Sequence, residues 1–169
     1  MTMTAPTPEG APAEPGGAAP LPAKARSAER GVRYHARALA LQGLYGWLLA
    51  GGDAGTIGSR LLSAEQLAKV DVEFFRALLA GSIAAAEELR QEFAPLVDRP
   101  VAGLSPVEHG LLLLGAYELK YRPEIPYRVV INEAIELAKS FGGTDGFRYV
   151  NGVLDKLAAR LRATEVAGR

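Results

Sequence analysis

Hydrophobic residues recur at the spacing of an α-helix over most of the chain, and the clearest pattern runs from Ile131 to Leu157. It predicts two amphipathic helices, whose inward positions are Ile131, Ile135, Leu137, Ala138 and Phe141 in the first and Val150, Leu154 and Leu157 in the second. The pair Gly142-Gly143 lies between them, where a left-handed C-terminal cap carries no Cβ penalty. Thr144 or Asp145 can cap the second helix through a side-chain oxygen.

The same spacing predicts two long helices earlier in the chain. One runs from about Glu29 to Ala50 and is stopped by the pair Gly51-Gly52. The other covers residues 71–93 without interruption and is expected to be the longest. Between them, residues 53–66 are expected to form a loop that holds at most a short helix around residues 57–62.

A further helix has a strong start signal. Ser105, Pro106 and Glu108 form a capping box with proline at the first helical position. The leucines at 111–114 make this helix apolar nearly all round, so we expect it to be largely buried. Pro126 is the expected first residue of the helix that follows. Taken together, the pattern predicts an all-α bundle of six to seven helices.

Composition divides the chain into three parts. Residues 1–27 contain six of the eleven prolines and almost no large apolar side chain, so we expect a disordered tail there. Residues 28–163 are the predicted helical domain, and residues 164–169 a C-terminal tail. The absence of cysteine excludes a disulfide framework and a thiolate metal site. No secretory signal or membrane span is recognisable, so we expect a cytoplasmic protein.

The net charge is zero, but the charges are unevenly distributed. Five basic residues lie between positions 23 and 37 against Glu29 alone. Between positions 65 and 98, seven acidic residues face three basic ones. A basic end and an acidic middle permit two partners of different character.

Catalytic chemistry is not indicated. His35 and His109 are the only histidines, and the sequence lacks the common zinc-protease, nucleophile-elbow and phosphate-loop motifs. Glu133 and Glu136 share a helix, but no histidine or third carboxylate accompanies them, so no metal site is expected. We therefore predict a protein that is not an enzyme and holds no cofactor.

Two pairs of residues are candidates for binding a polyanion. Arg33 and Arg37 lie one turn apart near the start of a helix. A bound phosphate would relieve both their mutual repulsion and their unfavourable interaction with the positive end of the helix dipole. Arg148 and Tyr149 fall in the first turn of another helix and offer a cation beside an aromatic ring. The alternative is that Arg148 is an ordinary surface charge and Tyr149 a packing residue at the helix start.

Four segments resemble the NusB family of bacterial transcription antitermination factors. They are INEAIELAKSFG followed by YVNGVLDKL, RYHARALALQGLYGW, VDVEFFRALLAG and SPVEHGLLLLGAYEL. The resemblance covers about residues 30–162. It implies a heterodimer with the ribosomal protein NusE, which binds the single-stranded boxA element of ribosomal RNA leaders. It further implies that the pair helps to assemble an antitermination complex on RNA polymerase.

The resemblance also assigns candidate residues. It places Arg33, Arg37, Tyr45, Arg148 and Tyr149 near the RNA, although Tyr45 could instead belong to the core. It turns Glu108 towards NusE, whereas the capping box gives the same residue a structural role. Tyr34 and His35 depart from the family, many members of which carry further arginines there. Two alternatives remain: an RNA-modifying enzyme, since this domain also occurs fused to methyltransferases, and a protein-binding adaptor that does not contact RNA.

Overall fold

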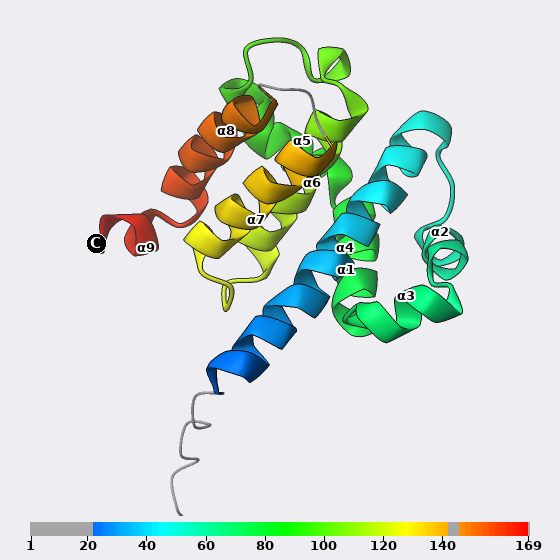
Figure 1. Ribbon diagram of the computed structural model, residues 1–169. Helices are drawn as coiled ribbons and strands as arrows, with labels where there is room; N and C mark the ends of the chain where they lie inside the picture. The colour runs from blue at the N-terminus through cyan, green and yellow to red at the C-terminus, as the bar shows by residue number, and fades with distance from the viewer. Residues whose placement is uncertain (1–21, 142–145, 169) are drawn as a thin grey trace, which may run out of the picture.

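The computed structural model describes residues 22–141 and 146–168, and every regular element in these ranges is helical (Figure 1). The α-helices are α1 (Ala23–Ala50), α2 (Ala54–Leu61), α3 (Ala64–Lys69), α4 (Val72–Ala84), α5 (Ala86–Phe93), α6 (Pro106–Tyr121), α7 (Tyr127–Phe141), α8 (Gly146–Leu161) and α9 (Ala163–Ala167). Two short 3₁₀ helices, η1 (Ala94–Leu96) and η2 (Val101–Gly103), connect α5 to α6. The predicted all-α fold is confirmed, but the described part of the chain contains nine α-helices rather than six or seven.

Helix α6 is the centre of the bundle, because α1, α4, α5, α7 and α8 all pack against it. Four consecutive residues, Leu111–Leu114, are each at most 3% exposed. Since four consecutive residues point around most of the circumference of a helix, neighbours must surround α6 on nearly every side. The predicted burial of this helix is confirmed, and its start at Pro106 is as expected.

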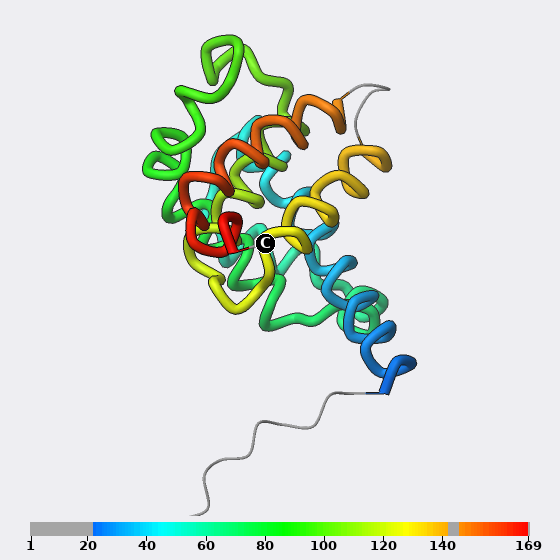
Figure 2. Tube along the Cα trace, turned by 90° about the vertical axis from the view of Figure 1, so that its left-hand side faces the viewer, coloured from blue at the N-terminus to red at the C-terminus, as the bar shows by residue number. Residues whose placement is uncertain are grey.

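Helix α1 begins at Ala23, earlier than the predicted Glu29, so the last residues assigned to the tail are helical. Its first turns project from the bundle in both views (Figures 1 and 2). Its fully buried positions begin only at Ala36. The helix ends at Gly51, whose φ of 68° lies in the left-handed region that favours glycine. The rest of the predicted tail, residues 1–21, lies outside the described residues.

The predicted continuous helix over residues 71–93 is wrong. It is broken at Ala85 into α4 and α5, and α1 is the longest helix instead. Both pieces pack against α6, and α5 also reaches α8. At Gly81 the approach is so close that a Cβ atom would overlap the Tyr117 ring of α6. The change of direction at Ala85 therefore lets the chain follow the surface of α6.

The predicted C-terminal tail is partly a helix, α9, that closes on the bundle (Figure 2). The buried guanidinium of Arg162 donates to the backbone oxygens of Leu119, Glu118 and Arg122, where α6 ends. Glu165 accepts a hydrogen bond of 2.9 Å from the backbone nitrogen of Tyr127, where α7 begins. These contacts satisfy the open ends of two helices.

The α7–α8 connection, which includes the predicted caps Gly142, Gly143, Thr144 and Asp145, lies outside the described residues. Among the helices that the structure describes, none is long and apolar enough to span a bilayer.

Candidate nucleic-acid interface

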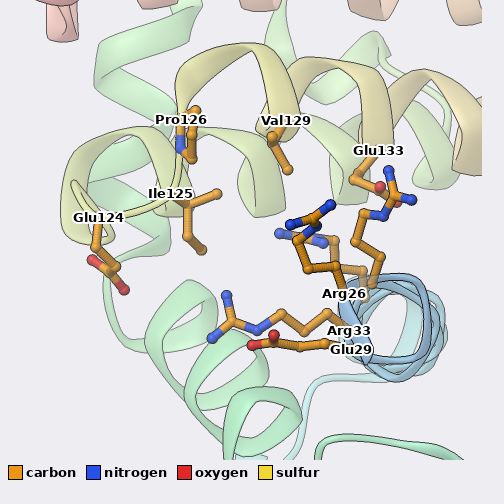
Figure 3. Close-up of a pocket in the computed structure, with 10 residues that line it drawn as sticks. Arg26, Glu29, Arg33, Glu124, Ile125, Pro126, Val129 and Glu133 are labelled. Atoms are coloured by element: carbon orange, nitrogen blue, oxygen red, sulfur yellow. The ribbon is translucent and has the colours of Figure 1, made fainter. Parts of the chain in front are cut away.

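Four arginines form a stripe along one face of α1. They are Arg26, Arg30, Arg33 and Arg37, and we call them the basic stripe. Because they recur every three or four residues, they face one side, towards the start of α7 (Figure 3). Burial increases along the stripe: Arg26 and Arg30 are exposed, the side chain of Arg33 is 31% exposed and that of Arg37 only 4%.

Arg37 at the buried end is held by Glu118 of α6. Its Nη2 lies 2.7 Å from Oε1 of Glu118, and its Nε lies 3.0 Å from Oε2. The guanidinium also lies 5.0 Å from the centre of the Phe74 ring. The prediction that Arg37 contacts phosphate does not fit this burial, because RNA could reach it only by breaking a desolvated ion pair. Its geometry is that of a residue that fixes α1 on α6.

Arg33, unlike Arg37, is partly accessible to an anion from solvent. Its Nε lies 3.9 Å from the Asp71 carboxylate, and its guanidinium covers the Phe74 ring at 4.7 Å. That buried Nε–H has no hydrogen-bond partner in residues 22–141 and 146–168. The ring and Asp71 restrict the side chain, while part of its charge remains accessible to an anion.

Tyr45 lies towards the other end of α1 and is 43% exposed, so the structure excludes the alternative that it belongs to the core. With Phe141 and Val107 it lines a surface cavity of about 370 Å³. Phe141 is 44% exposed, although the helical pattern assigned it to the buried face of α7. A pattern cannot distinguish the last turn of a helix, where the core ends, from the turns before it.

Arg148 and Tyr149 occupy the first turn of α8. Arg148 is exposed, whereas Tyr149 is partly buried and packs against the core. The guanidinium of Arg99, from the loop before η2, lies 4.8 Å from the centre of the Tyr149 ring. Burial raises the pKa of the Tyr149 hydroxyl. Tyr149 is therefore both a packing residue and a ring that already stacks on a cation.

Arg99 had no signal in the sequence, since it lies outside every predicted helix. It also pairs with Asp98 at 2.7 Å, a contact that raises the pKa of the guanidinium and lowers that of the carboxyl. Its side chain is 43% exposed, so it adds a cation beside Arg148 and Tyr149.

Glu108 has the predicted capping position. Its backbone nitrogen donates to Oγ of Ser105 at 3.2 Å, while its carboxylate lines a narrow cavity beside Gly146 at the start of α8. Oε2 of Glu108 is buried and has no hydrogen-bond partner among the described residues. The Ser105 half of the predicted capping box is therefore formed, whereas the described residues show no return bond from the backbone nitrogen of Ser105 to the Glu108 carboxylate. The contact with a partner remains a prediction.

A cavity of about 290 Å³ lies between α1 and α7, and its walls include Tyr34 and His35 of α1 and Ser140 of α7. It shares Gln42 and Phe141 with the cavity at Tyr45, so the two form one groove, which is separate from the space beside the basic stripe. The hydroxyl of Tyr34 lies 3.4 Å from Oγ of Ser140. The two positions that depart from the family pattern thus lie inside this groove.

The remaining polar clusters are structural. In the part of the chain that the structure describes, no group of three metal-binding side chains comes together. His109 accepts a hydrogen bond of 3.0 Å from Arg90, and burial together with that positive charge lowers its pKa to about 4. It is thus neutral near pH 7.

A helical domain that presents exposed arginines and aromatic rings has the surface chemistry of a protein that binds single-stranded nucleic acid. The NusB family model matches residues 34–159, so this chain belongs to the NusB family of transcription antitermination proteins. The predicted family and the prediction that the protein is not an enzyme are confirmed.

Relatives agree with this assignment over most of their length. The transcription antitermination protein NusB of Bordetella pertussis is 56% identical over 147 residues, which are 85% of this chain and 96% of that protein. NusB of Nitrosospira multiformis is 59% identical over 133 residues, which are 79% and 84% of the two chains.

Solved structures share the fold. NusB of T. maritima matches with a TM-score of 0.68 and 27% identity over 75% of this chain and 89% of that one. A chain in a crystal structure of the antitermination factors NusB and NusE in complex with double-stranded RNA matches with a TM-score of 0.65 and 22% identity, over 75% of this chain and 96% of that one.

Proposed function

We propose that this antitermination factor pairs with NusE in the cytoplasm and that the pair binds the boxA element of ribosomal RNA leader transcripts. The pair then helps to assemble the antitermination complex on RNA polymerase. The observation that carries the proposal is the groove between α1 and α7 that holds Tyr45 and Phe141, together with the exposed arginines of the basic stripe on the same helix. The NusB–NusE–RNA complex of a structural relative supports the choice of partners.

The groove suits a single strand. Unpaired RNA is bound by aromatic rings that stack on its bases and by arginines that contact its phosphates. Arg33 and Arg148 are partly or fully exposed and take the phosphate role. Tyr45 offers an exposed ring, and Tyr149 offers a ring that an incoming base would share with Arg99. Arg37 holds α1 in place and contacts no RNA.

The salt dependence of binding separates these roles. A phosphate contact releases counterions, so Arg33→Ala and Arg148→Ala should each lower the slope of log affinity against log salt by about one unit. A stacking contact releases none, so Tyr149→Ala should cost roughly 1–3 kcal/mol with little change of slope. The measurement is the affinity of the chain, with and without NusE, for boxA RNA at several salt concentrations.

Three results would contradict parts of the proposal. Unchanged slopes for both arginine variants would place the RNA elsewhere. Wild-type affinity for Tyr149→Ala would leave Tyr149 a packing residue only. No binding of boxA RNA, with NusE or without it, would refute the RNA function and favour a protein-binding adaptor.

Glu108 carries the proposed contact with NusE. In this proposal the Glu108 carboxylate attracts a basic residue of NusE. Glu108→Arg would turn that attraction into repulsion and should weaken the heterodimer by a few kcal/mol. Glu108 also lies in the first turn of α6, where its backbone nitrogen donates to the capping Ser105, so the free energy of unfolding must be measured beside binding. Unchanged heterodimer affinity in a folded variant would leave Glu108 with the capping role alone.

A further inference from the structure

The basic stripe forms one wall of a cleft of about 470 Å³ at the start of α1 and α7, which we call the α1–α7 cleft (Figure 3). The opposite wall is Glu124, which pairs with Arg122, and Ile125, Pro126, Val129 and Glu133. Val129 and Glu133 lie one turn apart on α7 and so share a face. Two helix faces of different chemistry therefore meet across a space large enough for a small organic group.

The α1 wall supplies hydrogen-bond donors at graded depth. Arg37 forms the deep end, where Glu118 neutralises it, while Arg30 lies exposed at the mouth. Arg33 extends across the cleft in Figure 3, with Glu29 beside it. A ligand that enters the cleft would thus meet positive charge first at the rim.

The α7 wall of the cleft is apolar and acidic, so it does not have the chemistry of an anion-binding site. Val129 is a large apolar side chain that remains 38% exposed and faces the cleft, and Pro126 is exposed beside it. Glu133 then adds a carboxylate, which would repel a phosphate placed against it. A simple anion could use the arginines, but it would gain nothing from the rest of this wall.

Glu133 is a half-buried acceptor without a partner. No ion pair or hydrogen bond within the described ranges occupies its carboxylate. Burial raises the pKa of this carboxyl, and the charges of Glu118 and Glu136 act in the same direction. Arg37 and Arg30 act against them and favour the ionised form. A carboxyl group at this depth that accepts no hydrogen bond from the described residues is best satisfied by a ligand that donates one.

We propose that the α1–α7 cleft is a pocket for one unpaired RNA base that carries an exocyclic amino group. Glu133 accepts from the amino group, as carboxylates do from the amino group of cytosine. Val129 and Pro126 pack against the face of the base, and Arg30 and Arg33 contact the phosphates that flank it. A base is flat and apolar on its faces, carries donors at its edge and is tied to phosphate, so it matches all three features of the cleft. This inference rests on the proposed RNA function and adds a preference among bases to it.

The test compares oligocytidylate with oligouridylate of equal length, binding to the full chain in the presence of NusE. The two polymers carry the same charge, and cytosine has an amino group where uracil has a carbonyl. Oligocytidylate should bind more tightly, by roughly tenfold for one good base contact. Glu133→Ala should abolish the difference by weakening oligocytidylate while leaving oligouridylate no weaker. Glu136→Ala, which removes an exposed carboxylate from the same helix, should retain the difference.

A second variant fills the cleft without touching the acceptor. Val129→Trp places a bulky ring at an exposed position, so it should fold with a normal thermal midpoint and reduce oligocytidylate affinity to that of oligouridylate. Equal binding of the two polymers by the wild type would overturn the proposal, as would a preference that survives in either Glu133→Ala or Val129→Trp. If boxA RNA still binds in that case, only the base pocket is refuted. If boxA RNA does not bind either, the RNA function fails with it.

Discussion

Arg37 and Glu118 form a forked ion pair in the interior of the bundle, although they are 81 residues apart in the sequence. Their side chains are 4% and 2% exposed. The pair joins α1 to α6. The other arginines of the basic stripe lie on the same helix face as Arg37, and this face lines the α1–α7 cleft.

Removal of one partner of this pair should destabilise the fold strongly. Arg37→Ala or Glu118→Ala leaves an uncompensated charge in the core and should cost about 3–5 kcal/mol, measured by urea unfolding. The double variant Arg37→Met, Glu118→Leu leaves no buried charge and should be much more stable than either single variant. Equal stability of Arg37→Ala and wild type would show that the pair contributes nothing.

His109 should make stability depend on pH. Its folded pKa of about 4 lies below the ordinary value of 6.5, so the unfolded chain takes up the proton first. The contribution of His109 to the free energy of unfolding is fully present above pH 6.5 and is lost as the pH falls from 6.5 towards 4. His109→Gln keeps an acceptor for Arg90 but cannot be protonated. The difference in unfolding free energy between wild type and His109→Gln should therefore change across this window and stay constant above it.

Arg162 should matter far more than its neighbour Arg160. Arg162→Ala removes the buried donor to three backbone oxygens at the end of α6, of which those of Glu118 and Arg122 also accept a backbone N–H, so it should cost about 1–3 kcal/mol. Arg160 is 49% exposed and pairs with Glu92, so Arg160→Ala should cost less than about 1 kcal/mol. The thermal midpoints of the two variants test this prediction. Similar midpoints would mean that the contacts of Arg162 do not stabilise the end of α6.

Two glycines should respond oppositely to alanine. At Gly81 an added Cβ would overlap the Tyr117 ring, so Gly81→Ala should destabilise by about 1–3 kcal/mol. At Gly152, in α8, no described atom outside its own helix lies within 4 Å of the added Cβ. Gly152→Ala should therefore stabilise the protein by about 0.5–1 kcal/mol through helix propensity. A stabilising Gly81→Ala would contradict the close approach of α4 to α6.

Deletion of residues 1–21 should leave the thermal midpoint nearly unchanged. Their composition predicts disorder, and the first turns of α1 that follow them are largely exposed. A large fall of the midpoint would show that this segment packs on the bundle.

The sequence determined those features that neighbouring residues decide. Ser105 and Pro106 start α6 by local capping chemistry, and Gly51 ends α1 because its left-handed backbone favours glycine. The four leucines of α6 predicted that this helix is largely buried, because a helix that is apolar all round needs neighbours on every side. The NusB family was recognisable from the sequence because each segment that resembles it is a run of consecutive residues.

Tertiary structure alone decided what depends on residues distant in the chain. The apolar pattern continues across Ala85, so the break between α4 and α5 is visible only in the folded structure, where the two pieces pack separately. Arg33 and Arg37 look equivalent in the sequence, but Glu118 arrives from another helix and takes one of them into the core. Arg99 lies in a loop and meets Tyr149 only once α8 is in place. Local interactions specify helix ends that have capping residues, such as Ser105 and Gly51, whereas the break at Ala85 and the partner and exposure of a charged side chain are set by how the helices pack.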